Sequence, residues 1–297
     1  SSGAREAAAG APPRAPPAPG LPGGRGPSRE GNMPMLIEEV QGEEAGPDSG
    51  FKFHFLPDAQ FSSFGSPAIQ PLLDKWGFGS DMAMCTFRVE QQVQQDQMQD
   101  MLDSFFRDRE VLGVLRSLTR IIVTSPDKVR VHWEQMGTKV VSMSFLNRFE
   151  ECGAVGPSGH IRGRIEEDWE GVPIINLLRE VILMEDSEMY DEFSEQERKE
   201  FLFRIFSHVV FGGASNQWED HIQEYMKVTK EIYKDLLTVR RNDTGDVEVV
   251  STIASVRSLG PGGEVFPNGS PLNFCYVIFD PVMRHIRVWY FGYRPLW

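Results

Sequence analysis

Cysteine is scarce in this chain, and long apolar runs are missing from it. The three cysteines, Cys85, Cys152 and Cys275, lie far apart and form no C-x-x-C pair. A disulfide framework or a zinc knuckle needs closely spaced pairs of thiols, so the sequence favours reduced cysteines, as in a cytosolic protein. No run of about 18 apolar residues occurs, and the first residues lack the apolar core of a signal peptide. We therefore expect neither a membrane-spanning helix nor a secretion signal.

The first 50 residues hold little that can form a core. They contain 9 Pro and 10 Gly, without a single Phe, Tyr or Trp. Such a segment cannot bury enough apolar surface to offset the entropy of ordering its backbone. The sequence therefore predicts a disordered Pro/Gly-rich tail over residues 1–50. Residues 51–297 are expected to form a single globular domain, which is long enough to bury a core without disulfides or metals.

Positive charge is also in short supply, because the formal net charge is −13. Attraction to phosphates dominates nonspecific nucleic-acid binding, so this balance argues against nucleic acid as a partner. It favours partners with basic surfaces, although acidity also serves solubility alone.

Apolar periodicity and turn residues give a coarse set of expected elements. In the first half they are a strand at 51–56, a short helix at 66–76, helices over 98–118, and strands at 121–123 and 129–133 around a turn at 125–127. The Gln-rich residues 88–99 read as a solvated helical extension or a loop. Residues 140–149 fit a strand or a helix, and 153–163 form a glycine-rich loop.

The second half is more regular. Its expected elements are a helix starting at Pro173, a helix from a capping box at Ser194 through Val210, a long helix over 218–239, and strands at 247–256, 274–279 and 285–291. The last two strands are joined by a hairpin loop at 280–284. Strands at the end and helices in the middle predict an α+β fold, with central helices packed against mixed or antiparallel strands.

Three patterns resemble chemical sites, and each has a plainer interpretation. Gly212-Gly213-Ala214 precedes a helix, but without a following Lys-Ser/Thr it fits a helix C-cap better than a phosphate loop. His208 and His221 flank that turn without a metal-ligand spacing such as H-x-x-x-H. Ser158 and His160 lack the third group that orients a catalytic base. We therefore expect no catalytic residues, no metal and no cofactor, and so no enzyme.

An acidic run from Glu185 to Glu200 carries eight carboxylates against Arg198 and Lys199. A charge run is most often a solvated face. Aromatic and apolar residues interleave with the charges here, so a docking patch for a basic partner is the alternative. The residues predicted to bind a partner are Glu185, Asp186, Glu188, Tyr190, Asp191 and Glu192.

Aromatic residues also crowd the C-terminal segment. Within the expected strands we assign them mainly to the core, because aromatic residues are enriched in strands. The terminal residues from Tyr293 onward, and Trp297 above all, are the better candidates for an interface anchor.

The chain resembles the cilia- and flagella-associated protein 300 family over most of residues 51–291, most densely from 183 to 241. The matching residues include Glu185-Asp186-Ser187-Glu188, Glu200-Phe201-Leu202-Phe203, Gly212-Gly213-Ala214, Ile232-Tyr233-Lys234-Asp235-Leu236 and Ser142-Met143-Ser144-Phe145. The tail, the Gln-rich stretch and residues 120–140 depart from the family pattern.

The resemblance implies a non-catalytic factor for axonemal organisation and cilium motility, acting in assembly of the outer and inner dynein arms by protein binding. It implies dynein axonemal assembly factors as partners, together with the intraflagellar transport machinery and axonemal dynein chains. The implied locations are the cytoplasm and the ciliary axoneme. A structural component resident on the axoneme is the alternative, and a cryptic nucleotide binder is a third class.

Overall fold

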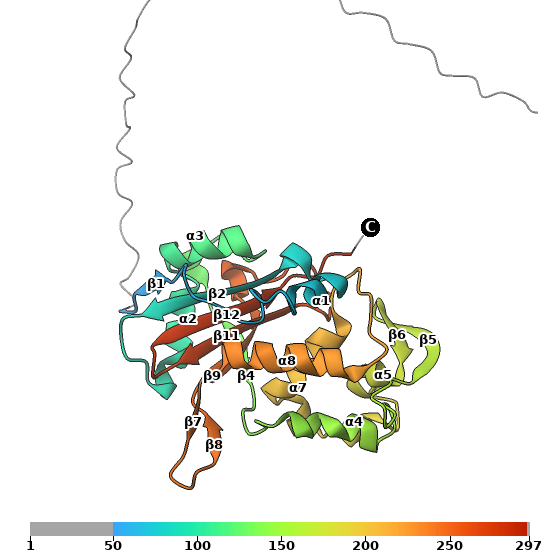
Figure 1. The fold of residues 1–297 in the computed structure, drawn as a ribbon. Helices are drawn as coiled ribbons and strands as arrows, with labels where there is room; N and C mark the ends of the chain where they lie inside the picture. The colour runs from blue at the N-terminus through green and yellow to red at the C-terminus, as the bar shows by residue number, and fades with distance from the viewer. Residues whose placement is uncertain (1–49, 296–297) are drawn as a thin grey trace, which may run out of the picture. The chain divides into compact units, whose positions relative to one another are not determined.

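The structure, a computed structural model, describes residues 50–295 (Figure 1). The predicted tail, apart from Gly50, and Trp297 lie outside these residues. The helices of the described part are α1 (Gln70–Lys75), α2 (Met98–Phe105), α3 (Arg109–Leu118), α4 (Arg148–Glu151), α5 (Leu177–Leu183), α6 (Glu195–Arg198), α7 (Phe201–Phe211) and α8 (Ile222–Leu236). Its strands are β1 (Phe53–Phe55), β2 (Met82–Val89), β3 (Ile122–Val123), β4 (His132–Gln135), β5 (Gly163–Trp169), β6 (Val172–Asn176), β7 (Val239–Arg241), β8 (Val247–Val249), β9 (Thr252–Ser258), β10 (Gly263–Glu264), β11 (Phe274–Asp280) and β12 (His285–Phe291).

Six strands form the central antiparallel sheet, in the order β1-β2-β12-β11-β9-β4. β11 and β12 form the predicted hairpin, with Phe274 opposite Phe291 and Asp280 opposite His285. The Asp280 carboxylate fixes the hairpin loop by accepting the backbone N–H groups of Val282 and Met283. The expected α+β fold with central helices on antiparallel strands is confirmed.

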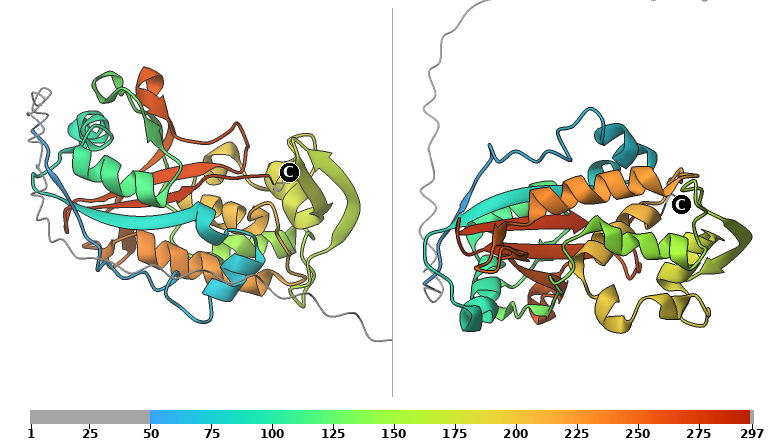
Figure 2. Two further views of the ribbon diagram at one scale, coloured as in Figure 1. Left: turned by 90° about the horizontal axis from the view of Figure 1, so that it is seen from above. Right: turned by 60° about the horizontal axis from the view of Figure 1, so that its bottom comes forward.

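Both faces of the sheet are covered, so the central strands contribute side chains to two hydrophobic cores, one on each face. On β12, Trp289 and Phe291 pack into the core that contains the buried faces of α7 and α8. Val288 and Tyr290, which point the opposite way, pack into the core of α2 and α3. Figures 1 and 2 show these two pairs of helices on opposite sides of the sheet. Burial on both faces explains why β11 reads as a continuous apolar run.

β2 was not predicted, although it lies inside the sheet. The sequence interpretation left its first residues unassigned and placed 88–99 in a solvated helix or loop, whereas Val89 ends β2 and is buried. The strand is apolar on both faces because it packs between two layers of helices. Its sequence therefore shows no clean period-two pattern.

The two strands expected around the turn at 125–127 do not pair with each other. β3 pairs with β10, and β4 pairs with β9 at the edge of the central sheet. A short 3-10 turn at Pro126–Lys128 separates them. The partner strands lie more than a hundred residues away in the sequence. The turn residues between β3 and β4 therefore give no information about which strands pair.

The helix expected from Pro173 begins later. Pro173 lies in β6, and α5 starts at Leu177 because the Asn176 side chain caps it by accepting the Arg179 backbone N–H at 3.0 Å. Two other helices also begin later than expected: α1 begins at Gln70, and α8 spans Ile222–Leu236 and excludes Trp218 and Val239.

The helix expected to run from Ser194 through Val210 is two helices. The capping box at Ser194 is confirmed, since its hydroxyl accepts from the Glu197 N–H and the Glu197 carboxylate accepts from the Ser194 N–H. The chain then breaks at Lys199 and Glu200, where Gly137 bonds to both sides of the break. The strand expected over 247–256 is likewise divided into β8 and β9, because β8 pairs with β7 instead.

Candidate interaction surface

The predicted acidic residues lie on the segment that connects α5 to α6. Glu185, Asp186, Glu188 and Asp191 are exposed there. Tyr190 and Glu192 are half-buried, in the single 3-10 turn of the segment. The segment therefore separates its outward carboxylates from the side chains that hold it in place.

Arg198 is the first of two arginines that hold this segment. Arg198 is 6% exposed, and its guanidinium donates to the carbonyl oxygens of Val181 and Ile182 in the last turn of α5. It also donates to the carbonyls of Phe193 and Tyr190. The last carbonyls of a helix lack intrahelical donors and carry partial negative charge, so a cation at this position satisfies both needs.

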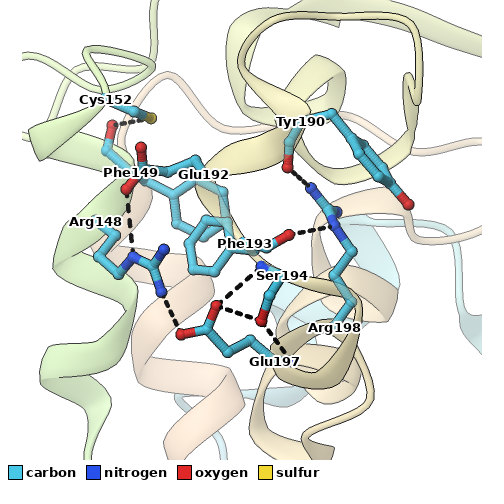
Figure 3. A network of polar contacts seen from close by, with 9 residues as sticks. All are labelled: Arg148, Phe149, Cys152, Tyr190, Glu192, Phe193, Ser194, Glu197 and Arg198. Carbon is cyan, nitrogen blue, oxygen red and sulfur yellow. Dashed lines mark hydrogen bonds and ion pairs between the residues drawn. The ribbon is translucent and has the colours of Figure 1, made fainter.

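The Arg198 guanidinium also lies over the ring of Tyr190, at 3.4 Å from the ring centroid. This stacking fixes the aromatic side chain that the sequence placed among the candidate residues. Figure 3 shows the carbonyl oxygens of Tyr190, which begins the 3-10 turn, and of Phe193, which follows it, both bonded to Arg198. Tyr190 therefore anchors the segment from inside.

Arg148 on α4 is the second arginine. It donates to Glu197 at 2.6 Å and to Glu192 at 3.3 Å, and its guanidinium lies 4.5 Å from the Phe193 ring (Figure 3). Burial acts to raise the pKa of Glu197, but hydrogen bonds from Ser194 and Arg148 outweigh it and hold this pKa below 4.5. Glu192 is thus a tether between α4 and the acidic segment.

The four exposed carboxylates of the segment differ from Glu192 in this respect. Within residues 50–295, no salt bridge is formed by Glu185, Asp186, Glu188 or Asp191. The structure therefore joins six of the predicted residues in one segment, four outward and two inward. The sequence interpretation missed Arg148, which lies far from the run, and counted Arg198 only as a countercharge.

A family model described as cilia- and flagella-associated protein 300 matches residues 50–291. A protein of that description from Chlamydomonas reinhardtii is 31% identical over 254 residues, which cover 80% of this chain and 95% of that protein. Another from Paramecium tetraurelia is 28% identical over 220 residues, 73% of this chain and 84% of that protein. The chain belongs to the cilia- and flagella-associated protein 300 family. No solved structure matches it.

The family match includes both anchoring arginines and the whole acidic segment. It ends at residue 291, before Trp297, which also lies outside the described residues. The predicted terminal anchor stays a prediction. The aromatic residues of β11 and β12 are buried in the two cores, as the sequence indicated.

Gly212 and His208, from the other patterns weighed as chemical sites, have structural roles. Gly212 ends α7 with a φ of 59°, which confirms the helix C-cap. His208 donates to or accepts from the Tyr276 hydroxyl at 2.8 Å, and its ring packs against Phe274. His221 is exposed before α8, with its ring 5.5 Å from that of His160.

Two further findings concern the described residues as a set. Across residues 50–295, no three or more His, Cys, Asp or Glu side chains are grouped so as to hold a metal ion. None of the helices in this range combines the length and the apolar character that crossing a bilayer requires.

Proposed function

We propose that this protein is a non-catalytic factor of cilium motility that acts in assembly of the outer and inner dynein arms by binding other proteins. Its relatives are named as cilia- and flagella-associated proteins, which supports the ciliary part of the proposal. The proposed partners are dynein axonemal assembly factors, with the intraflagellar transport machinery and axonemal dynein chains. The proposed locations are the cytoplasm and the ciliary axoneme.

The observation that carries the proposal is the fixed acidic segment. Four exposed carboxylates project from a segment that Arg198 and Arg148 hold against α4, α5 and α6. A pre-ordered segment loses little conformational entropy when a partner binds. Rim charges of this kind speed association and select basic partners. A surface that only kept the protein soluble would not need two buried or half-buried arginines to fix it.

Affinity purification from ciliated cells tests the proposal. A variant that neutralises Glu185, Asp186, Glu188 and Asp191 as Gln or Asn should recover at least about tenfold less of the dynein assembly factors than the unaltered protein. The control neutralises four exposed carboxylates elsewhere, at Asp58, Asp127, Asp243 and Glu264. Both variants change the net charge by the same amount. A difference in partner recovery between them must therefore come from where the neutralised carboxylates lie.

Three results would contradict the proposal. The first is that the unaltered protein recovers neither dynein chains nor their assembly factors. The second is that both variants lose partners equally, since the effect would then follow from net charge alone. The third is that neutralising the acidic segment unfolds the protein, because its four exposed carboxylates form no described salt bridges and should contribute little to stability. Circular dichroism of both purified variants checks the third.

A further inference from the structure

The β5–β6 ribbon exposes one of its two strands almost entirely. β6 alternates buried and half-buried residues against the body of the domain, whereas β5 contains no buried residue. Figure 1 and both views of Figure 2 place this ribbon away from the central sheet, at the margin of the described residues. β5 is therefore an edge strand on the outer side.

The free edge of β5 carries unpaired backbone groups. Asp168 lies opposite Pro173, which has no N–H to donate. Antiparallel pairs alternate between those that exchange hydrogen bonds and those that do not, and Pro173 fits only the second kind. The backbone N–H and C=O of Asp168 therefore point away from β6. Among residues 50–295, no strand pairs with that side of β5.

An apolar side chain stands on this edge strand. Ile165 is 89% exposed, the highest value among the exposed large apolar side chains of the described residues. An exposed edge strand with an apolar side chain is a template for pairing with another chain. Natural proteins usually protect such an edge with charge, and β5 carries Glu166, Glu167 and Asp168 against a single cation, Arg164.

The ribbon, α5 and the acidic segment together carry a large excess of negative charge. Residues 163–192 contain ten Asp and Glu against two Arg, with no Lys or His. Both arginines are already engaged within the protein. Arg179 is 1% exposed and donates to the Pro173 and Val210 carbonyls. Arg164 pairs with Glu167 at 2.8 Å and with Glu180 at 3.2 Å.

Glu180 connects the two parts of this surface. Besides pairing with Arg164 of β5, its carboxylate accepts a hydrogen bond from the Ser187 hydroxyl at 2.7 Å. Ser187 lies in the middle of the acidic segment, between Asp186 and Glu188. The N-terminal end of β5 is therefore joined to the acidic segment through Glu180.

We infer that β5 binds an extended segment of a partner protein in which Lys or Arg alternates with apolar residues, by strand addition to its free edge. The main-chain bonds would follow the β-augmentation pattern, in which alternate side chains confer specificity. A basic side chain would meet Asp168, where the pairing of β5 with β6 is regular, and further basic and apolar side chains would contact Glu166 and Ile165 in the irregular part of the strand between Gly163 and Glu167. A second copy of this chain fits poorly, because like charges opposite each other destabilise a strand pair. The inference rests on the proposed function, since it specifies the partner chemistry of the same surface.

Fluorescence anisotropy with the purified full chain tests this inference. The probe is a labelled synthetic peptide of alternating Lys and Val, about eight residues long, the size of an ordinary strand. A second probe is the same peptide with its central backbone amides N-methylated. Strand addition predicts a Kd at least about tenfold weaker for the methylated peptide, because it has lost its donors. Equal binding of the two peptides would overturn strand addition and leave only charge attraction.

Two substitutions locate the bound peptide. Ile165→Ser and Glu166→Lys should each weaken the Kd by about fivefold or more. Their matched controls are Val247→Ser, an apolar residue 41% exposed on the separate β7–β8 ribbon, and Glu264→Lys, an exposed strand carboxylate. If the controls weaken binding as much as the substitutions in β5, the inference is wrong.

The two hypotheses fail separately. If dynein assembly factors are recovered from ciliated cells but the methylated and unmethylated peptides bind alike, strand addition is overturned and the proposed function stands. If the peptide binds β5 as described but no dynein factor is recovered, the proposed function falls and the strand-binding edge remains.

Discussion

The guanidinium of Arg198 lies 3.4 Å from the centroid of the Tyr190 ring and bonds to the carbonyl of the same residue. Tyr190 thus receives two contacts from one side chain, one through its backbone and one through its ring. The arrangement ties the acidic segment to the end of α5 and to α6 at a single point.

Arg198→Met should destabilise the protein by about 3 kcal/mol or more, because four buried or half-buried carbonyls lose their donor at once. Arg198→Lys keeps the charge but not the planar set of donors, so we expect an intermediate loss. Urea unfolding followed by circular dichroism measures both. Arg240→Met, at an exposed arginine on β7, is the control and should change stability by less than about 1 kcal/mol. If Arg198→Met lowers the free energy of unfolding no more than Arg240→Met does, the anchoring role of Arg198 is contradicted.

Local parts of this arrangement could be predicted from the sequence. The capping box at Ser194 and the C-cap at Gly212 depend on residues within one helical turn, and both are confirmed. The β11–β12 hairpin has a short loop, and it was also predicted. In each of these cases the residues that decide the structure are neighbours in the chain.

The contacts that fix the candidate site could not be predicted in this way. Arg148 meets Glu192 and Glu197 from positions 44 and 49 residues away. The break before α7 depends on Gly137, and β5 was missed because its polar residues do not alternate with apolar ones. The exposed carboxylates were found because charge is visible in sequence, whereas the groups that position them are set by tertiary packing.

Stability should depend on pH through His208. Burial of its ring, with Arg204 and Arg257 nearby, holds the pKa of His208 well below 6.5. The unfolded chain therefore takes up a proton below pH 6.5 that the folded protein does not. The contribution of neutral His208 to the free energy of unfolding is fully present above pH 6.5. It falls as pH decreases, by at most about 1.4 kcal/mol per pH unit for one proton.

The His208→Gln variant should reduce this dependence between pH 6.5 and 5, measured by urea unfolding at a series of pH values. Carboxylates whose pKa is lowered from 4.5, such as Glu134 and Glu197, lose their contribution only at lower pH and do not interfere. An unchanged slope in the variant would show that the folded protein accommodates the charged ring.

Two glycine substitutions should act in opposite directions. A Cβ on Gly213 would lie 2.0 Å from the Gly77 carbonyl oxygen, so Gly213→Ala must push two backbone segments apart and should cost about 1–3 kcal/mol or more. Gly113 lies inside α3 with open space around its Cα, and Gly113→Ala should stabilise by about 0.5–1 kcal/mol. Thermal and urea unfolding of both variants distinguish close backbone approach from helix propensity.

The turn of the β5–β6 ribbon can be improved without altering the edge of β5. Glu170 and Gly171 form a two-residue loop with φ values of 50° and 79°, the signs of a type I′ turn. Glutamate is unfavourable in this left-handed region, where Asn is better tolerated, so Glu170→Asn should stabilise by up to about 1 kcal/mol. Gly171→Ala should destabilise by about 1 kcal/mol for the same reason.

Because the Asp168 side chain would still accept the backbone N–H of residue 171, Glu170→Asn should preserve the ribbon and bind the Lys/Val peptide as the unaltered protein does. A stabilised variant that binds the peptide much more weakly would mean that Glu170 contacts the ligand directly.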